Sequence, residues 1–404
     1  MSSADNPPRN EKFRIAIVGS GPIGKLLACS VTPHPCVAYY LFDGEEQVVL
    51  SDYDLGPEFL HTINVLNPKL GQAIRQKSRL SQTWMNIYHS GDQDRLIEAV
   101  EVSEDRLHGH ISRRDLLDLL NSHTPSDVIQ HGERLTGIEK LQDGTLELIL
   151  DDGSTTTANA VWACDGIDSL CRKVLQGDRS QAAESSGVTC YHVRVPSSSL
   201  VNEVAADLTL ETSAFIGVGG WSLFTHPSAR IDELDITAFT TESKQPNGED
   251  VLQVFPGRNT RSDKLLRKLT GTPEGPRRVE LDNLVSLDPF YHPDLCLTTF
   301  GDAASGKLPH LGGSLSSGAI GVSVFLHDGL NPLIDRLSHD ATNEEITSLI
   351  MEASGLYDVT HRSLAQKLLD FSNEQGRLWM SGTIDIEELT RRPKFLWTCA
   401  DTQR

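Results

Sequence analysis

The sequence lacks the features that mark membrane, secreted or metal-binding chains. No apolar run approaches the length of a membrane span, and residues 1–11 are polar and contain proline, unlike a signal peptide. The seven cysteines are scattered, odd in number and without a metal-type pair. We therefore expect a cytoplasmic protein of a reducing compartment, with no membrane span and no metal site.

Basic residues are also scarce. The 404 residues include 36 Lys and Arg against 56 Asp and Glu, which gives a formal net charge of −20. This balance argues against nucleic acid or an anionic membrane as a partner, although a local basic pocket for an anionic small molecule would not show in the total. The length predicts two or three domains, or one large composite domain. Nothing in the sequence indicates an oligomeric state.

What the sequence does contain is a glycine loop between two apolar strands. Residues 13–18 are predicted to form a buried strand, and a Gly-x-Gly-x-x-Gly loop follows at 19–24. An apolar helical pattern comes next, and a second strand at 37–42 ends at Asp43. This order of strand, loop, helix, strand and acid predicts a dinucleotide site. The alternative is a glycine-rich turn in an unrelated α/β protein.

Each part of this stretch has a physical reason. Gly19 allows the tight turn, Gly21 lets the backbone approach a pyrophosphate, and Gly24 lets the helix pack on the strand. The helix start presents N–H groups to the phosphates. Asp43 lies about 20 residues past the loop, where a carboxylate binds ribose hydroxyls.

Two later stretches also place an aspartate beside a glycine at the end of a strand. A strand at 160–164 leads into Asp165-Gly166, and a strand at 297–300 leads into Gly301-Asp302. A carboxylate at such a strand end can accept hydrogen bonds from sugar-like hydroxyls. The alternative is an aspartate that caps a helix.

Two further features suggest anion binding. Gly312-Gly313, shortly after Pro309, precedes a predicted helix and would expose N–H groups to a developing anion. Arg113 lies in the first turn of another predicted helix, where a cation is unfavourable for the helix dipole. A nearby phosphate would explain this arginine, but so would an exposed position without consequence.

Taken together, the three glycine-and-acid motifs resemble the FAD-dependent aromatic hydroxylases, the group A flavoprotein monooxygenases, over nearly the whole chain. The resemblance implies an α/β fold with a Rossmann-like FAD-binding domain, an inserted antiparallel β-sheet substrate domain and C-terminal helices. The expected parts are 12–184 and 285–330 for the FAD-binding domain, 185–284 for the sheet and 331–404 for the helices. The cofactor-binding residues that it implies are Gly19, Gly21, Gly24, Asp43, Arg113, Asp165, Gly301, Asp302, Pro309, Gly312, Gly313 and Leu315.

The resemblance also implies an activity. FAD would be reduced by transiently bound NAD(P)H and would use O₂ to hydroxylate or epoxidise an aromatic or polyketide- or terpenoid-like small molecule. Arg194, on a predicted strand at 188–195, is the first catalytic candidate, because a guanidinium could bind and activate a phenol. The alternative is an ion pair with one of the many acidic side chains. His226 and His310 are further catalytic candidates, with a structural or surface role as their alternative.

The sequence departs from the family pattern in the segment that faces the flavin. Ser305 stands where many relatives have histidine, Gly312-Gly313-Ser314 replaces a Gly-x-Gly, and Ile320-Gly321 replaces a Glu-Asp pair. Two other functions therefore stay open: a flavoenzyme that performs oxidation, cyclisation or isomerisation without net hydroxylation, and an FAD-binding fold with no redox role. A plain NAD-dependent dehydrogenase is disfavoured, because it would not need Gly301-Asp302.

Overall fold

A computed structural model describes most of the chain. The described residues are 12–44, 52–91, 93–103, 106–177, 184–200, 208, 210–228, 232–241, 251–272, 275–283 and 285–399, and of Asp43 and His131 only the backbone is described.

A six-stranded sheet forms the base of the molecule, in the order β18-β19-β12-β1-β2-β8. All neighbouring strands are parallel except the β18–β19 pair. Its two central strands are buried except at Arg14, as their largely apolar sequences predict. The predicted Rossmann-like sheet is therefore present. The strands are β1 (Phe13–Val18), β2 (Val37–Asp43), β8 (Ile129–His131), β12 (Ala160–Ala163), β18 (Tyr291–His292) and β19 (Leu297–Thr299).

Helices and short strands surround this sheet. The helices in the first half of the chain are α1 (Pro22–Ser30), α2 (Pro57–Leu66), α3 (Pro68–Lys77), α4 (Arg113–His123) and α5 (Leu170–Gln176). Two small sheets accompany them, with the orders β3-β7-β4 and β11-β10-β9. Their strands are β3 (Tyr53–Leu55), β4 (Arg79–Ser81), β7 (His108–Ile111), β9 (Leu135–Lys140), β10 (Leu146–Leu150) and β11 (Thr155–Ala158).

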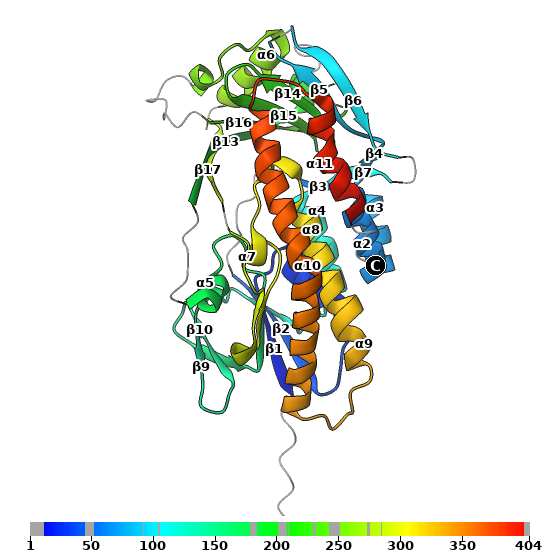
Figure 1. Cartoon of the computed structure of the whole chain (residues 1–404), viewed down its shortest axis with the longest axis vertical. Helices are drawn as coiled ribbons and strands as arrows, with labels where there is room; N and C mark the ends of the chain where they lie inside the picture. Colours follow the sequence, from blue (N-terminus) through cyan, green and yellow to red (C-terminus); the bar gives the residue numbers. More distant parts are fainter. Residues whose placement is uncertain are drawn as a thin grey trace, which may run out of the picture.

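A seven-stranded sheet lies at the other end of the molecule, in the order β17-β13-β16-β15-β14-β5-β6 (Figure 1). It is antiparallel apart from the β14–β5 pair. Two of its strands come from residues before 102, so this layer extends beyond the predicted segment 185–284, whose boundaries stay a prediction. The strands are β5 (Thr83–His89), β6 (Arg95–Glu101), β13 (Glu184–Pro196), β14 (Ser213–Gly217), β15 (Trp221–Pro227), β16 (Glu233–Thr240) and β17 (Arg277–Asn283).

The last quarter of the chain is helical, as expected. It contains α7 (Asp302–Ser305), α8 (Ser314–Ser323), a π-helical turn at Val324–Leu330, α9 (Asn331–Ile334), α10 (Asn343–Trp379) and α11 (Ile386–Cys399). Helix α10 begins at a capping box between Thr342 and Glu345 and runs the length of the molecule, from the six-stranded sheet to the seven-stranded one (Figure 1). It therefore fixes the two sheets relative to each other. Within the described residues, no helix combines the length and apolar composition that crossing a bilayer requires.

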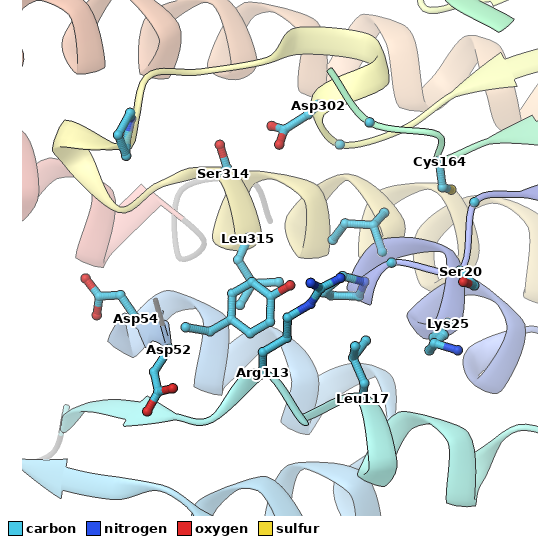
Figure 2. A pocket seen from close by; sticks show the side chains of 18 of the residues that line it. Ser20, Lys25, Asp52, Asp54, Arg113, Leu117, Cys164, Asp302, Ser314 and Leu315 are labelled. Atoms are coloured by element: carbon cyan, nitrogen blue, oxygen red, sulfur yellow. The ribbon is translucent and has the colours of Figure 1, made fainter. Parts of the chain in front are cut away.

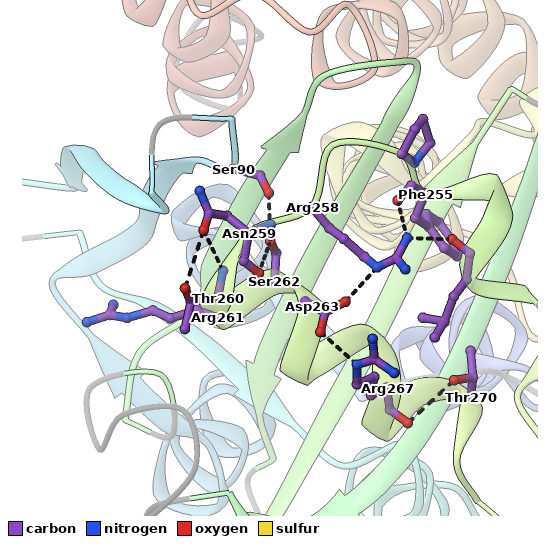
Figure 3. A network of polar contacts seen from close by, with 12 residues as sticks. Ser90, Phe255, Arg258, Asn259, Thr260, Arg261, Ser262, Asp263, Arg267 and Thr270 are labelled. Atoms are coloured by element: carbon purple, nitrogen blue, oxygen red, sulfur yellow. Dashed lines mark hydrogen bonds and ion pairs between the residues drawn. The ribbon is translucent and has the colours of Figure 1, made fainter.

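Helix α6 (Thr260–Thr270) packs on the outer face of the seven-stranded sheet, and its first turn is held by side chains (Figure 3). Asn259 and Ser262 form a capping box. Asp94, from the turn between β5 and β6, accepts hydrogen bonds from the amide of Arg261 at 2.6 Å and the hydroxyl of Ser262 at 2.9 Å. The polar groups of this helix start are thus satisfied within the protein.

Candidate active site and cofactor-binding site

One large cavity, of about 1940 Å³, runs between the six-stranded and the seven-stranded sheets. Figure 2 shows its length: Ser20 and Lys25 lie at one end, Asp52 and Asp54 at the other, and Arg113 between them. Two predicted residues are not among its lining: Gly24, and Asp43, whose side chain lies outside the described part. The predicted site residues that line it are Gly19, Gly21, Arg113, Asp165, Gly301, Asp302, Pro309, Gly312, Gly313, Leu315, Arg194, His226 and His310.

The glycine loop is shaped by close backbone contacts. Gly19 has a φ of +101°, and a Cβ there would lie 2.4 Å from the carbonyl oxygen of Cys164. A Cβ on Gly24 would lie 1.9 Å from the carbonyl oxygen of Gly19. A Cβ on Gly21, in contrast, would meet nothing within 4 Å. The first and third glycines are thus required by packing, whereas the second leaves room beside the start of α1.

Two basic residues from α1 and α4 enter the cavity, Lys25 at one end and Arg113 nearer the middle. Arg113 begins α4 directly after Ser112, whose side chain caps the helix, and its guanidinium extends into the cavity (Figure 2). Lys25 donates a hydrogen bond of 2.8 Å to Asn121 of α4. The two helices therefore present positive charge where the pyrophosphate of a dinucleotide would lie against the start of α1.

Asp165 both lines the cavity and holds the start of α5. Its carboxylate accepts hydrogen bonds from the hydroxyl of Ser169 at 2.5 Å and the amide of Cys171 at 3.2 Å. Arg172, one turn later, is buried and donates to the carbonyl oxygens of Ala303 and Ala304. This arginine therefore ties the Asp165 segment to the Gly301-Asp302 segment across the cavity wall.

The carboxylate of Asp302 is only partly satisfied in this wall. Its Oδ1 is buried without a hydrogen-bond partner. Burial raises its pKa, while the charge of Lys307 and a hydrogen bond from Ser314 lower it. The ammonium of Lys307 lines the cavity and donates to the carbonyl oxygen of Ser305 at 2.7 Å. Burial lowers the pKa of Lys307 to about 8, against the opposing effect of Asp302.

The segment from Pro309 to Leu315 forms the floor of the cavity near the seven-stranded sheet. Gly312 has a φ of +67°, and α8 begins at Gly313 without a side-chain cap. His310 is 7% exposed, and neither of its ring nitrogens has a hydrogen-bond partner. Its ring packs edge-on against Phe239 at a centroid distance of 4.7 Å. Burial lowers the pKa of His310 to about 4, so the ring is neutral at pH 7.

Arg194 lies on the cavity face of β13, but it is held by carboxylates. Its Nε and one Nη each donate at 2.8 Å to Asp235, and the same Nη donates at 2.6 Å to Asp52. His192 also contacts Asp235, at 3.0 Å. Burial alone would raise the pKa of Asp235, but His192 and Arg194 lower it to about 2. This geometry favours the ion-pair alternative for Arg194, and a catalytic role stays a prediction.

The structure also brings together residues that the sequence analysis missed. His108 contacts Asp54, and the rings of His108, His110 and His226 follow one another at centroid distances of 5.1 and 5.6 Å. Burial lowers the pKa of both His110, to about 3, and His226. The sequence offered only the alternation His108-Gly-His110, which places both rings on one face of a strand.

The comparisons with known proteins bear directly on this cavity. No family model matches the chain. A salicylate hydroxylase of Pseudomonas putida is 27% identical over 405 residues, which cover 93% of this chain and 87% of that protein. An FAD-dependent monooxygenase of Aspergillus niger is 24% identical and covers 91% of this chain and 88% of its own length.

Solved structures show the same fold. A salicylate hydroxylase substrate complex superposes with a TM-score of 0.74 at 21% identity and covers 98% of this chain and 95% of that one. HpxO of Klebsiella pneumoniae, complexed with FAD and uric acid, has a TM-score of 0.72 at 14% identity. The superposition covers 99% of this chain and 97% of HpxO. The chain is thus similar over nearly its whole length to proteins named salicylate hydroxylase and FAD-dependent monooxygenase. The family resemblance and the fold class predicted from the sequence are therefore confirmed.

The residues around the cavity fit FAD. A buried carboxylate oxygen without a partner, on Asp302, is suited to the hydroxyls of a ribityl chain. The starts of α1 and α8 both lack a side-chain cap and both border the cavity, so their N–H groups are available to the pyrophosphate and to the flavin ring. The individual roles of these residues stay predictions.

Proposed function

We propose that this protein is an FAD-dependent monooxygenase that uses NAD(P)H and O₂ to hydroxylate or epoxidise an aromatic or polyketide- or terpenoid-like small molecule. One observation carries the proposal: the predicted cofactor motifs and the aromatic face of the seven-stranded sheet line a single cavity. The relatives named salicylate hydroxylase and FAD-dependent monooxygenase support it.

Residues at different places along the cavity would bind the cofactor and enclose the substrate. Bound FAD would supply the redox chemistry and the activation of oxygen. Asp302 would hold the ribityl hydroxyls, and the start of α8 would stabilise negative charge on the flavin ring. Phe224 and Phe239, both buried on the seven-stranded sheet, would enclose an aromatic substrate and exclude water.

The polar groups beside these aromatic rings would bind the hydroxyl of the substrate. His110 and His226 are neutral at pH 7, so either ring could form a hydrogen bond with a phenol. Arg194 would act as a positioning residue, because its carboxylate partners fix the strand that carries His192.

A visible absorption spectrum with cofactor analysis is the first test. Purified protein should be yellow and should release FAD on denaturation. With an aromatic substrate, NAD(P)H consumption should accompany a product that has gained one oxygen atom. Colourless protein that also fails to take up added FAD would rule the proposal out.

A second function is favoured by one observation in the altered flavin-facing segment. Ser305 replaces the usual histidine, and its hydroxyl is buried without a hydrogen-bond partner. We propose oxidation, cyclisation or isomerisation without net hydroxylation as the alternative. A product that has lost two hydrogens, or has an unchanged mass, would identify it. The cytoplasmic location is likewise a proposal, supported by seven cysteines that are all free.

A further inference from the structure

We propose that the substrate end of the cavity selects a neutral hydroxyarene and rejects aromatic carboxylates. The inference rests on the proposed function, because it names the substrate class of the same site. It follows from the way in which the charged side chains at this end are already paired with one another.

The guanidinium of Arg194 is the central cation of this end, and it is already hydrogen-bonded to carboxylates of the protein. Asp235 is 0% exposed and takes two of its hydrogen bonds, and Asp52 takes a third. Glu233 lies 3.6 Å from another of its nitrogens. A substrate carboxylate would have to displace one of these partners, at a cost in desolvation and repulsion.

The remaining charge at this end is also unfavourable for an acid. Asp54 lines the cavity beside Gly312, whose Cβ position lies 2.8 Å from its Oδ2. The carboxylates of Asp52, Asp54, Glu233 and Asp235 outnumber the guanidinium groups of Arg194, Arg277 and Arg79, the last of which lies beside His110. Arg277 is an exposed residue of the edge strand β17, where solvent screens its charge.

A neutral phenol would not have to displace a carboxylate from Arg194 and would not be repelled by the carboxylates at this end. His110 and His226 offer neutral ring nitrogens, and the carboxylate of Asp54 is a strong acceptor for a hydroxyl donor. Phe224 and Phe239 follow on the same face of the sheet and provide an apolar surface for the ring. A site built in this way discriminates by repulsion as well as by attraction.

Matched pairs of ligands test the proposal directly. Salicylamide and salicylate have the same shape and differ in charge, as do 4-hydroxybenzamide and 4-hydroxybenzoate. Binding to the holoenzyme would be followed by the flavin absorbance and, independently, by the fluorescence of Trp84, which lines the cavity. We expect each amide to bind at least about tenfold more tightly than its acid.

Asp52→Asn sharpens the test, because it removes one of the carboxylates that occupy Arg194 while keeping the side-chain shape. The preference for the amide should then fall by about tenfold. Asp143→Asn removes the same charge from an exposed turn outside the cavity and should leave the preference unchanged.

Tighter binding of the acids, equal binding within each pair, or no binding by either amide overturns the proposal. A preference that is equally reduced by Asp143→Asn would overturn the assigned role of Asp52. These results are separate from a failure of the proposed function, which would appear as absent FAD or as no oxygen insertion, because the ligand assay measures equilibrium binding and not turnover.

Discussion

The two long walls of the cavity differ in whether their polar groups have hydrogen-bond partners. On the wall formed by the seven-stranded sheet, Arg194, Asp235 and His192 satisfy one another. On the wall formed by the loops, Asp302 and His310 keep buried polar atoms without hydrogen-bond partners. Unpartnered buried polar groups are costly and uncommon in folded proteins. We infer that the loop wall is completed by a ligand, whereas the charged cluster of Arg194, Asp235 and His192 on the sheet wall is already paired.

The helix starts repeat this contrast. Helices α4 and α10 begin at Ser112 and Thr342, whose side chains accept hydrogen bonds from the first turn. Helices α1 and α8 begin at Gly21 and Gly313 and have no side-chain cap. Both of these glycines border the cavity. The predictions below test this division between self-sufficient and ligand-completed parts, in order of decreasing effect.

The largest effect is expected for Gly24→Ala. The new Cβ would meet the carbonyl oxygen of Gly19 at 1.9 Å, and this neighbour is backbone that cannot rotate away. We expect a loss of about 3 kcal/mol or more in the free energy of unfolding, measured in denaturant, together with loss of FAD. Gly21→Ala is the matched control: its Cβ meets nothing within 4 Å, so the apoprotein should fold normally and bind FAD more weakly. Equal stability of the two variants would contradict this account.

Arg194→Ala tests the wall formed by the seven-stranded sheet, where charged side chains pair with one another. Removing one partner of a fully buried ion pair costs about 3–5 kcal/mol, and the 32% exposure of Arg194 reduces this to about 2–3 kcal/mol. We expect a destabilised apoprotein even before any effect on product formation is measured. A variant with wild-type stability and no activity would instead support a direct catalytic role.

The same wall predicts an acid dependence of stability. The pKa of Asp235 is about 2 in the folded protein, against 3.8 in the unfolded chain. The stabilisation is therefore fully present above pH 4 and is lost as the pH falls towards 2. Urea titrations of wild type and Arg194→Ala between pH 2.5 and pH 5 should show a smaller loss in the variant, whose carboxylate has lost its main cation.

Asp302→Ala tests the wall formed by the loops, which we infer is completed by a ligand. Loss of a charged hydrogen bond costs about 1.5–3 kcal/mol, so the dissociation constant for FAD should rise by about one to two decades. Because the carboxylate is unsatisfied in the apoprotein, its removal should not destabilise the fold. Titration of apoprotein with FAD measures the first effect and thermal unfolding measures the second. An unchanged dissociation constant would remove Asp302 from the site.

The sequence predicted the wall formed by the loops better than the wall formed by the seven-stranded sheet. Gly19, Asp302 and Gly312 belong to local motifs in which strand, glycine and helix start lie within a few residues, so spacing alone reveals them. The network of Arg194 joins residues 52, 194 and 235, which come together only when β13 pairs with β16. Such long-range pairings leave no periodic signal, and the contact of Asp54 with His108 across the β3–β7 pair was missed for the same reason.

Lys307 predicts an alkaline effect of the same sign as that of Asp235, because the folded pKa of each group lies below its unfolded pKa. Its pKa is about 8 in the folded apoprotein, against 10.5 in the unfolded chain. Between these values the unfolded state binds more protons, so the stability of the apoprotein should rise with pH, by an amount on the order of 1 kcal/mol. Lys307→Met should remove this rise. A rise of the same size in the variant would show that another group titrates.

The smallest effect is expected far from the cavity, at the start of α6. Asn259→Ala removes a side chain that accepts from the amide of Thr260 at 2.8 Å and takes part in the capping box with Ser262. Loss of such a cap costs about 1 kcal/mol. Asp94 still accepts from the next two amides, at 2.6 and 3.3 Å, so the helix should keep its position. Unfolding in denaturant should show this loss, with unchanged affinity for FAD. A weaker affinity would mean that the outer face of the sheet is coupled to the cavity, which the satisfied polar groups around α6 argue against.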